Sequence, residues 1–189
     1  MRLPEGLLEQ AQHLVKREPK RPKQASLRRA ISAAYDALFH LLISEAVLNW
    51  RRAEDRVELA RMFEHAHMRL ICANQRDELN KGFKTKNKAG RPNQEEAVKR
   101  NLHRVVSTFV QMHEQRELAD YDYSGNWTRT DVLPKVEGVA AAFKAWKAVR
   151  NEDIAQAFLF ALLYRKRRYQ WGFDSGALEV AMRPFPSVP

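Results

Sequence analysis

The sequence predicts an all-α protein, an up-and-down bundle of about five to six helices. Apolar residues recur at the three- and four-residue spacing of helices over most of the chain, and no segment shows convincing strand alternation. Glycine is scarce, at 7 of 189 residues, about half of average usage, which argues against turn-rich all-β folds. The longest unbroken apolar run, residues 157–164, is far shorter than the ~18 residues that span a bilayer. We therefore expect a cytoplasmic protein with no membrane association.

The first half of the chain is expected to hold three helices. Apolar spacing predicts the first over residues 4–17, followed by a basic linker that contains two prolines. Ser26 is expected to cap a long second helix that continues to Trp50. Residues 55–73 form the third, and the short connection before it predicts that the second and third helices pack antiparallel.

The second half begins with a predicted loop. Residues 74–93 lack apolar periodicity and are rich in Asn, Lys and Gly, so we expect a long basic loop. Three further helices are predicted over residues 94–119, 130–146 and 153–168, with Thr130 and Asp131 at the start of the middle one. We assign residues 1–168 to a single domain and residues 169–189, which hold three prolines, to an extended C-terminal tail.

The chain is strongly basic. Lys and Arg number 33 against 23 Asp and Glu, which gives a net charge of +10 and a pI near 9.9. Such an excess attracts polyanions, most often nucleic acid, although a solvated surface is the alternative explanation. Between residues 81 and 91 the predicted loop contains no acidic residue at all. We take its basic residues as candidate RNA contacts: Lys81, Lys84, Lys86, Lys88 and Arg91.

One segment carries the residue types of metal-free RNA cleavage, namely Arg61 with His65 and His67 on the third predicted helix. A histidine can exchange a proton with the ribose hydroxyl or the leaving oxygen near neutral pH, and an arginine can hold the scissile phosphate. Arg61 and His65 are four residues apart and would share a helical face. Arg61 and His67, six apart, diverge on a regular helix. An ordinary charged helix surface is the competing interpretation.

We expect no cofactor and no metal ion. The sequence contains no Walker loop, no Gly-x-Gly-x-x-Gly and no His-Glu-x-x-His motif. His65 and His67 are two residues apart on a helix and point in different directions, so they cannot chelate together. The single cysteine, Cys72, can form neither an internal disulfide nor a Cys-based metal site.

A second polar cluster lies where the fourth predicted helix ends, and it consists of Arg116, Asp120, Tyr121 and Asp122. Acidic residues at this end of a helix oppose its dipole, so we expect a compensating cation nearby. Arg28, Arg29 and Arg61 are the candidates. We interpret the cluster as a structural salt-bridge node that sets helix packing.

Three segments together resemble HEPN-domain proteins. Residues 26–40, SLRRAISAAYDALFH, resemble the first long helix of that family. Residues 63–65, FEH, resemble a short signature in the next helix, and ADYD at 119–122 followed by WTRTDV at 127–132 resembles the stretch before the last core helix. The order and spacing of these segments agree with the family over roughly residues 5–150.

The resemblance implies a helical bundle that dimerises and that, in many HEPN proteins, cleaves RNA without a metal ion in toxin–antitoxin, phage-defence and CRISPR systems. The hallmark of these ribonucleases is Arg-x4–6-His, which only Arg61-x5-His67 matches in this sequence. Its implied partners are RNA, a second copy of the chain, and an antitoxin or defence-system protein. Other HEPN branches lack the activity, so the alternative is a non-catalytic helical module that binds nucleic acid or a protein partner.

Overall fold

The computed structural model describes residues 2–85 and 94–164, and these fold into helices with no strand. The predicted all-α helical bundle is confirmed. Seven helices occur in the described part of the chain, one more than expected, because the third predicted helix is divided in two. They are α1 (Leu3–Lys16), α2 (Gln24–Leu48), α3 (Arg56–Arg61), α4 (His65–Thr85), α5 (Gln94–Tyr121), α6 (Arg129–Val149) and α7 (Asp153–Leu163).

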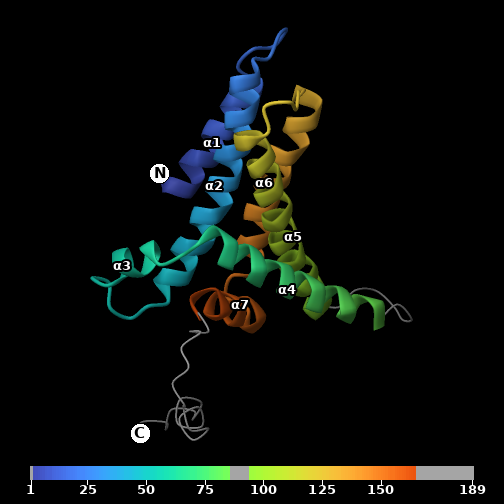
Figure 1. Cartoon of the computed structure of the whole chain (residues 1–189). Coiled ribbons are helices and arrows are strands. Elements are labelled where there is room, and N and C mark those ends of the chain that lie inside the picture. The colour runs from blue at the N-terminus through green and yellow to red at the C-terminus, as the bar shows by residue number, and fades with distance from the viewer. Residues whose placement is uncertain (1, 86–93, 165–189) are drawn as a thin grey trace, which may run out of the picture.

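Four long helices, α1, α2, α5 and α6, run lengthwise and alternate in direction (Figure 1). The central one is α2, which contacts α1, α5 and α6 along its length and α3 and α7 near its end. Its residues are buried on nearly every side, with Tyr35, Leu38 and Leu42 fully enclosed. By length and composition alone α2 could cross a membrane, but 78% of its most apolar window is buried inside the bundle. The apolar character of α2 thus matches its place in the core.

Helix α4 crosses the bundle instead of following α2 (Figure 1). It packs on α5 and α7, so the expectation that residues 55–73 lie antiparallel against α2 is wrong. The chain leaves helical geometry at residues 62–64 and changes direction there. This turn lets Met68, Cys72 and Leu79, which share one face of α4, reach the core. The short α3, by contrast, has no buried residue.

The predicted loop over residues 74–93 is also wrong in its first half, because α4 continues to Thr85. Leu79 is buried and Phe83 packs against the core, which extends the α4 stripe at helical spacing. Residues 86–93 lie outside the described residues, as do Arg165 to Arg168 of the last predicted helix and the predicted tail 169–189.

Two helix starts differ from the prediction. Ser26 is buried inside α2, which begins two residues earlier, and Lys23 precedes it without a side-chain cap. Thr128, not Thr130, caps α6: the side chains of Thr128 and Asp131 each bond the other's backbone NH in a capping box. Thr128 and Thr130 both stand at the start of α6, and residue spacing alone does not show which of them folds back on the first turn.

The α1–α2 corner is tied to the segment that precedes α6. The side-chain amide of Gln24 donates to the Trp127 carbonyl at 2.8 Å and accepts from the Trp127 NH at 2.9 Å. Arg129 donates to the carbonyls of Val15 at 2.8 Å and Pro19 at 2.6 Å, and also to that of Glu18. These contacts satisfy carbonyls where α1 ends, which would otherwise lack helical partners.

Candidate functional site

The Arg61 and histidine segment does not form one helical face. Arg61 is the last residue of α3, and His65 is the first residue of α4. The predicted continuous helix over residues 55–73 is therefore wrong, and with it the expected neighbourhood of Arg61 and His65. Arg61 is exposed, and among the described residues no hydrogen bond joins it to His65 or to His67.

His65, the first residue of α4, packs against two aromatic residues of α2. Its Nδ1 lies 2.7 Å from the hydroxyl oxygen of Tyr35, and either group can be the donor, depending on the imidazole tautomer. The His65 ring also stacks on Phe39, with centroids 4.1 Å apart and planes 26° from parallel. Burial lowers the pKa of His65 below its ordinary value, and the Arg116 guanidinium lowers it further. The neutral imidazole therefore predominates near pH 7.

Two charged side chains, Arg116 and Asp36, act on this histidine, and Asp120 pairs with the first of them. Arg116 on α5 lies over the Tyr35 ring, 5.6 Å from its centroid, and its Nε is 3.1 Å from a carboxylate oxygen of Asp120. Asp36 on α2 is half-buried, and burial raises its pKa, while the positive charge of Arg116 opposes that rise. We call Tyr35, Asp36, His65, Arg116 and Asp120 the His65 cluster. It combines a neutral imidazole, a guanidinium and two carboxyl groups at the meeting point of three helices.

The buried side of the cluster is aromatic. Tyr35 is fully enclosed, and burial raises the pKa of its hydroxyl well above the ordinary value. His113 on α5 meets the Tyr35 ring edge-on, with centroids 5.7 Å apart, and burial lowers its pKa. The Nδ1 of His113 is buried without a hydrogen bond. These rings fix Tyr35, and Tyr35 in turn fixes the orientation of His65.

Sequence analysis missed Tyr35, Asp36 and His113 as parts of a site. Tyr35 fits the apolar stripe of α2 and carries no polar signal of its own. Asp36 offered a signal, because an acidic residue in the middle of a strongly apolar helix needs a partner or partial exposure.

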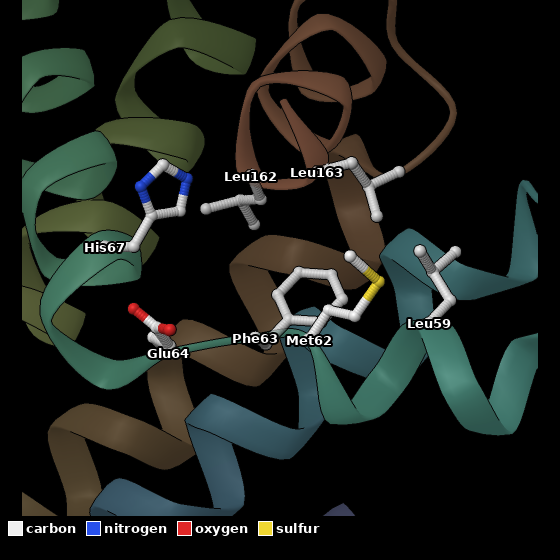
Figure 2. Close-up of a pocket in the computed structure, with 7 residues that line it drawn as sticks. All are labelled: Leu59, Met62, Phe63, Glu64, His67, Leu162 and Leu163. Carbon is white, nitrogen blue, oxygen red and sulfur yellow. The ribbon is translucent and has the colours of Figure 1, made fainter. Parts of the chain in front are cut away.

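His67 faces a different environment. It lines a small apolar pocket of about 40 Å³ together with Leu59, Met62, Phe63, Glu64, Leu162 and Leu163. Figure 2 shows its ring beside Leu162 of α7, with Glu64 at the edge and Phe63 and Met62 farther along. The Nε2 of His67 is buried without a hydrogen bond. The structure therefore places His65 and His67 in two separate surroundings.

The polar residues at the end of α5 divide into two groups. Asp120 belongs to the His65 cluster, where it accepts a hydrogen bond of 2.6 Å from Ser32 and pairs with Arg116. Asp122 turns toward its own loop and accepts from the NH and hydroxyl of Ser124. Tyr121 is 71% exposed. Among these carboxylates, Asp120 is the one that bonds a side chain of α2.

The cation at this end of α5 is Arg28, and it binds backbone rather than carboxylate. Its guanidinium donates to the carbonyls of Ala119 and Asp122 at 2.8 Å and to that of Gly125 at 2.7 Å. These carbonyls carry the negative end of the helix dipole, so the arginine acts as a side-chain cap.

The candidate RNA contacts are only partly described. Lys81 is exposed on α4, not in a loop, and its Nζ lies 2.7 Å from a carboxylate oxygen of Glu78. Lys84 also belongs to α4, and its side chain is outside the described part. Lys86, Lys88 and Arg91 lie outside the described residues as well.

The structure groups no three His, Cys, Asp or Glu side chains as a metal ion would need, within residues 2–85 and 94–164. Comparison of the chain with models of protein families, with curated proteins and with solved structures finds no match.

Proposed function

We propose that the protein binds RNA and cleaves it without a metal ion, with His65 as the group that exchanges protons. One observation carries this assignment: the Tyr35 hydroxyl and the Phe39 ring hold the His65 imidazole in one orientation beside Arg116 and Asp36. The charge of +10 supports the choice of a polyanionic substrate. The resemblance to HEPN proteins supports the choice of RNA.

The chemistry follows from the two nitrogens of His65. In the tautomer that carries its proton on Nδ1, the Nδ1–H group donates a hydrogen bond to the Tyr35 oxygen. Nε2 then has a free lone pair and can accept the proton of a ribose 2′-hydroxyl. The lowered pKa keeps this neutral form populated at pH 7. The freed oxygen then attacks the adjacent phosphorus to form a 2′,3′-cyclic phosphate, and the P–O5′ bond breaks. The leaving 5′-oxygen takes up a proton from water, and the His65 imidazolium returns its proton to the solvent.

Arg116 supplies positive charge for the phosphate. A guanidinium has five N–H donors, and the Asp120 contact engages its Nε. The remaining donors can hold the phosphate oxygens as negative charge develops. Asp120 is positioned by Ser32 and orients the guanidinium in this arrangement. The HEPN hallmark pair Arg61 and His67 is the second arrangement to test, and it requires a second copy of the chain to complete it, as in the dimer that the resemblance implies.

The decisive experiment is RNA cleavage in EDTA. Purified protein should cleave cellular RNA, and His65→Ala should lower the rate roughly 10²–10⁴-fold, the usual contribution of a general base. Arg116→Lys keeps the charge and should still lower the rate, because a lysine lacks the planar fork. His13→Ala, which changes an exposed histidine on α1, is the matched control and should cleave as the wild type does.

A second candidate function is a non-catalytic RNA-binding module. The partly buried Tyr35–His65 contact favours it, since the same aromatic packing would serve to fix α4 on α2. Intact RNA in EDTA together with undiminished RNA binding would establish this function and reject catalysis. Cleavage that is lost in His67→Ala but kept in His65→Ala would move the site to the Arg61 and His67 pair.

The biological setting remains a proposal from the resemblance. A ribonuclease of this kind would need a protein that restrains it, which is the role of an antitoxin or of a defence-system partner. Co-expression with the products of adjacent genes, followed by cleavage assays, tests for such a partner.

A further inference from the structure

An apolar groove lies where α2 ends, between α3 and α7. It has a volume of about 460 Å³ and is lined mainly by Trp50, Leu59, Phe160, Leu163 and Tyr164. This volume lies within the range of pockets that hold ligands or partner side chains. The groove shares Leu59 and Leu163 with the His67 pocket, so the two hollows adjoin.

Large aromatic side chains stand exposed in this groove. Phe160 is 67% exposed, Tyr164 56% and Trp50 45%. Phe160 and Tyr164 stack on each other one helical turn apart, with centroids separated by 6.3 Å. Exposed apolar groups gathered at one place mark an interaction surface, whereas single ones scattered over a protein do not.

The chain itself carries a segment with matching chemistry directly after this groove. Tyr164 lines the groove, and residues 165–189 follow it. Aromatic residues occur at every second position there, at Tyr169, Trp171 and Phe173. An extended segment turns every second side chain to the same side, so these three rings can face one surface together.

We propose that residues 169–173 bind in this groove of the same molecule, with Tyr169, Trp171 and Phe173 packed against Trp50, Phe160 and Tyr164. The connection keeps the segment close to the groove, because Tyr169 follows Tyr164 by five residues, which span at most ~18 Å when extended. A short tether also raises the effective concentration of the segment into the millimolar range. The same segment from a second copy has no such advantage at micromolar protein concentration. The inference does not depend on RNA cleavage.

Hydroxyl-radical footprinting of the full chain tests this docking. Oxidation of Trp50, Phe160 and Tyr164 is measured by mass spectrometry relative to Tyr123, which is 91% exposed and serves as the internal reference. The test variant is Tyr169→Ser/Trp171→Ser/Phe173→Ser. The matched control is Leu178→Ser/Val180→Ser/Met182→Ser, which removes apolar residues at the same two-residue spacing farther along the chain.

We expect the groove residues to be protected in the wild type and in the control. In the aromatic variant their oxidation should rise roughly tenfold, because the tethered segment is bound for most of the time. Equal oxidation in all three proteins would overturn the proposal, and so would release in the control variant alone. Protection that disappears when the wild type is diluted would also overturn it, because the groove would then be covered by a second copy.

Discussion

The hydroxyl oxygen of Tyr35, a fully buried residue of α2, lies 2.7 Å from Nδ1 of His65, the first residue of α4. This contact joins the centre of the bundle to the helix that crosses it. It engages Nδ1 of His65 and leaves Nε2 as the ring nitrogen that Tyr35 does not contact. A tyrosine that looks like a core residue in the sequence is thus the hydrogen-bond partner of a histidine thirty residues later in the chain.

Tyr35→Phe isolates this contact, because it removes the hydroxyl and keeps the ring. We expect the free energy of unfolding to fall by about 1 kcal/mol, the usual net value of one hydrogen bond. RNA cleavage should fall and its pH profile should shift, because Nδ1 of His65 loses its hydrogen-bond partner. Urea denaturation and pH–rate curves measure the two effects. An unchanged pH profile would limit Tyr35 to a structural role.

Stability should decrease on acidification. Burial lowers the pKa values of His65, His103 and His113 below the ordinary 6.5. The unfolded chain therefore binds more protons than the folded chain as the pH falls through that value, and the free energy of unfolding decreases. Urea midpoints measured between about pH 7.5 and 5.5 test this, since both limits bracket the histidine pKa.

Asp36 has the opposite effect on the pH dependence of stability, and the Asp36→Asn variant isolates it. Burial raises the pKa of this carboxyl, so its protonation stabilises the folded state as the pH falls. In Asp36→Asn the loss of stability on acidification should be steeper than in the wild type. A midpoint that stays level in both proteins would contradict the assigned histidine environments.

Arg28→Ala should destabilise the protein more than most substitutions of partly exposed residues. It removes three hydrogen bonds to carbonyls of residues 119, 122 and 125, and hydrogen bonds from charged groups contribute ~1.5–3 kcal/mol each but not additively. We expect a loss of about 2–4 kcal/mol in the free energy of unfolding. Arg29→Ala, which changes the exposed neighbour, should stay within about 0.5 kcal/mol. Equal effects of the two would refute the capping role of Arg28.

Thr128→Ala should destabilise α6 by about 1 kcal/mol, the typical cost of losing an N-cap side chain. Thr130→Ala, two residues later on the exposed surface, should change the free energy of unfolding by less than about 0.5 kcal/mol. Thermal and urea unfolding distinguish the two. The reverse order would place the cap where the sequence alone suggested it.

RNA binding should weaken steeply with salt. If Lys81, Lys84, Lys86 and Lys88 each contact a phosphate, replacing all four by alanine should flatten the slope of log K against log salt by roughly 3, since each contact contributes ~0.7 on single strands. Replacement of Lys144 and Lys147, exposed on α6, is the control. An unchanged slope in the first variant would place the RNA elsewhere on the molecule.

The sequence predicted the fold class and most helices, because their apolar stripes are regular. It failed to predict the break at residues 62–64, because the apolar pattern continues across it. Three residues of that pattern, Val57, Met62 and Leu70, lie exposed. Periodicity shows that a segment can form a helix, but it does not show where the helix changes direction to reach the core. The helical part after residue 74 was missed because only Leu79 and Phe83 mark its inner face.

The candidate site was predicted in one member only. His65 was singled out by its residue type, and Arg116 and Asp120 were interpreted as a separate node. Their meeting around Tyr35 depends on α4 crossing α5, a relationship between segments about fifty residues apart. No spacing rule within one helix contains that information. The HEPN-like character of the fold stays a prediction.

The break at residues 62–64 also separates two levels of local stability. Because α3 has no buried residue and α4 is anchored by Met68 and Cys72, α3 can open on its own while α4 stays in place. Its amide hydrogens should exchange with solvent far sooner than those of α2, whose exchange requires the bundle to unfold. Leu59 moves with α3, and it is shared by the groove and the His67 pocket. We therefore expect an opening of α3 to change the shape of both hollows at once.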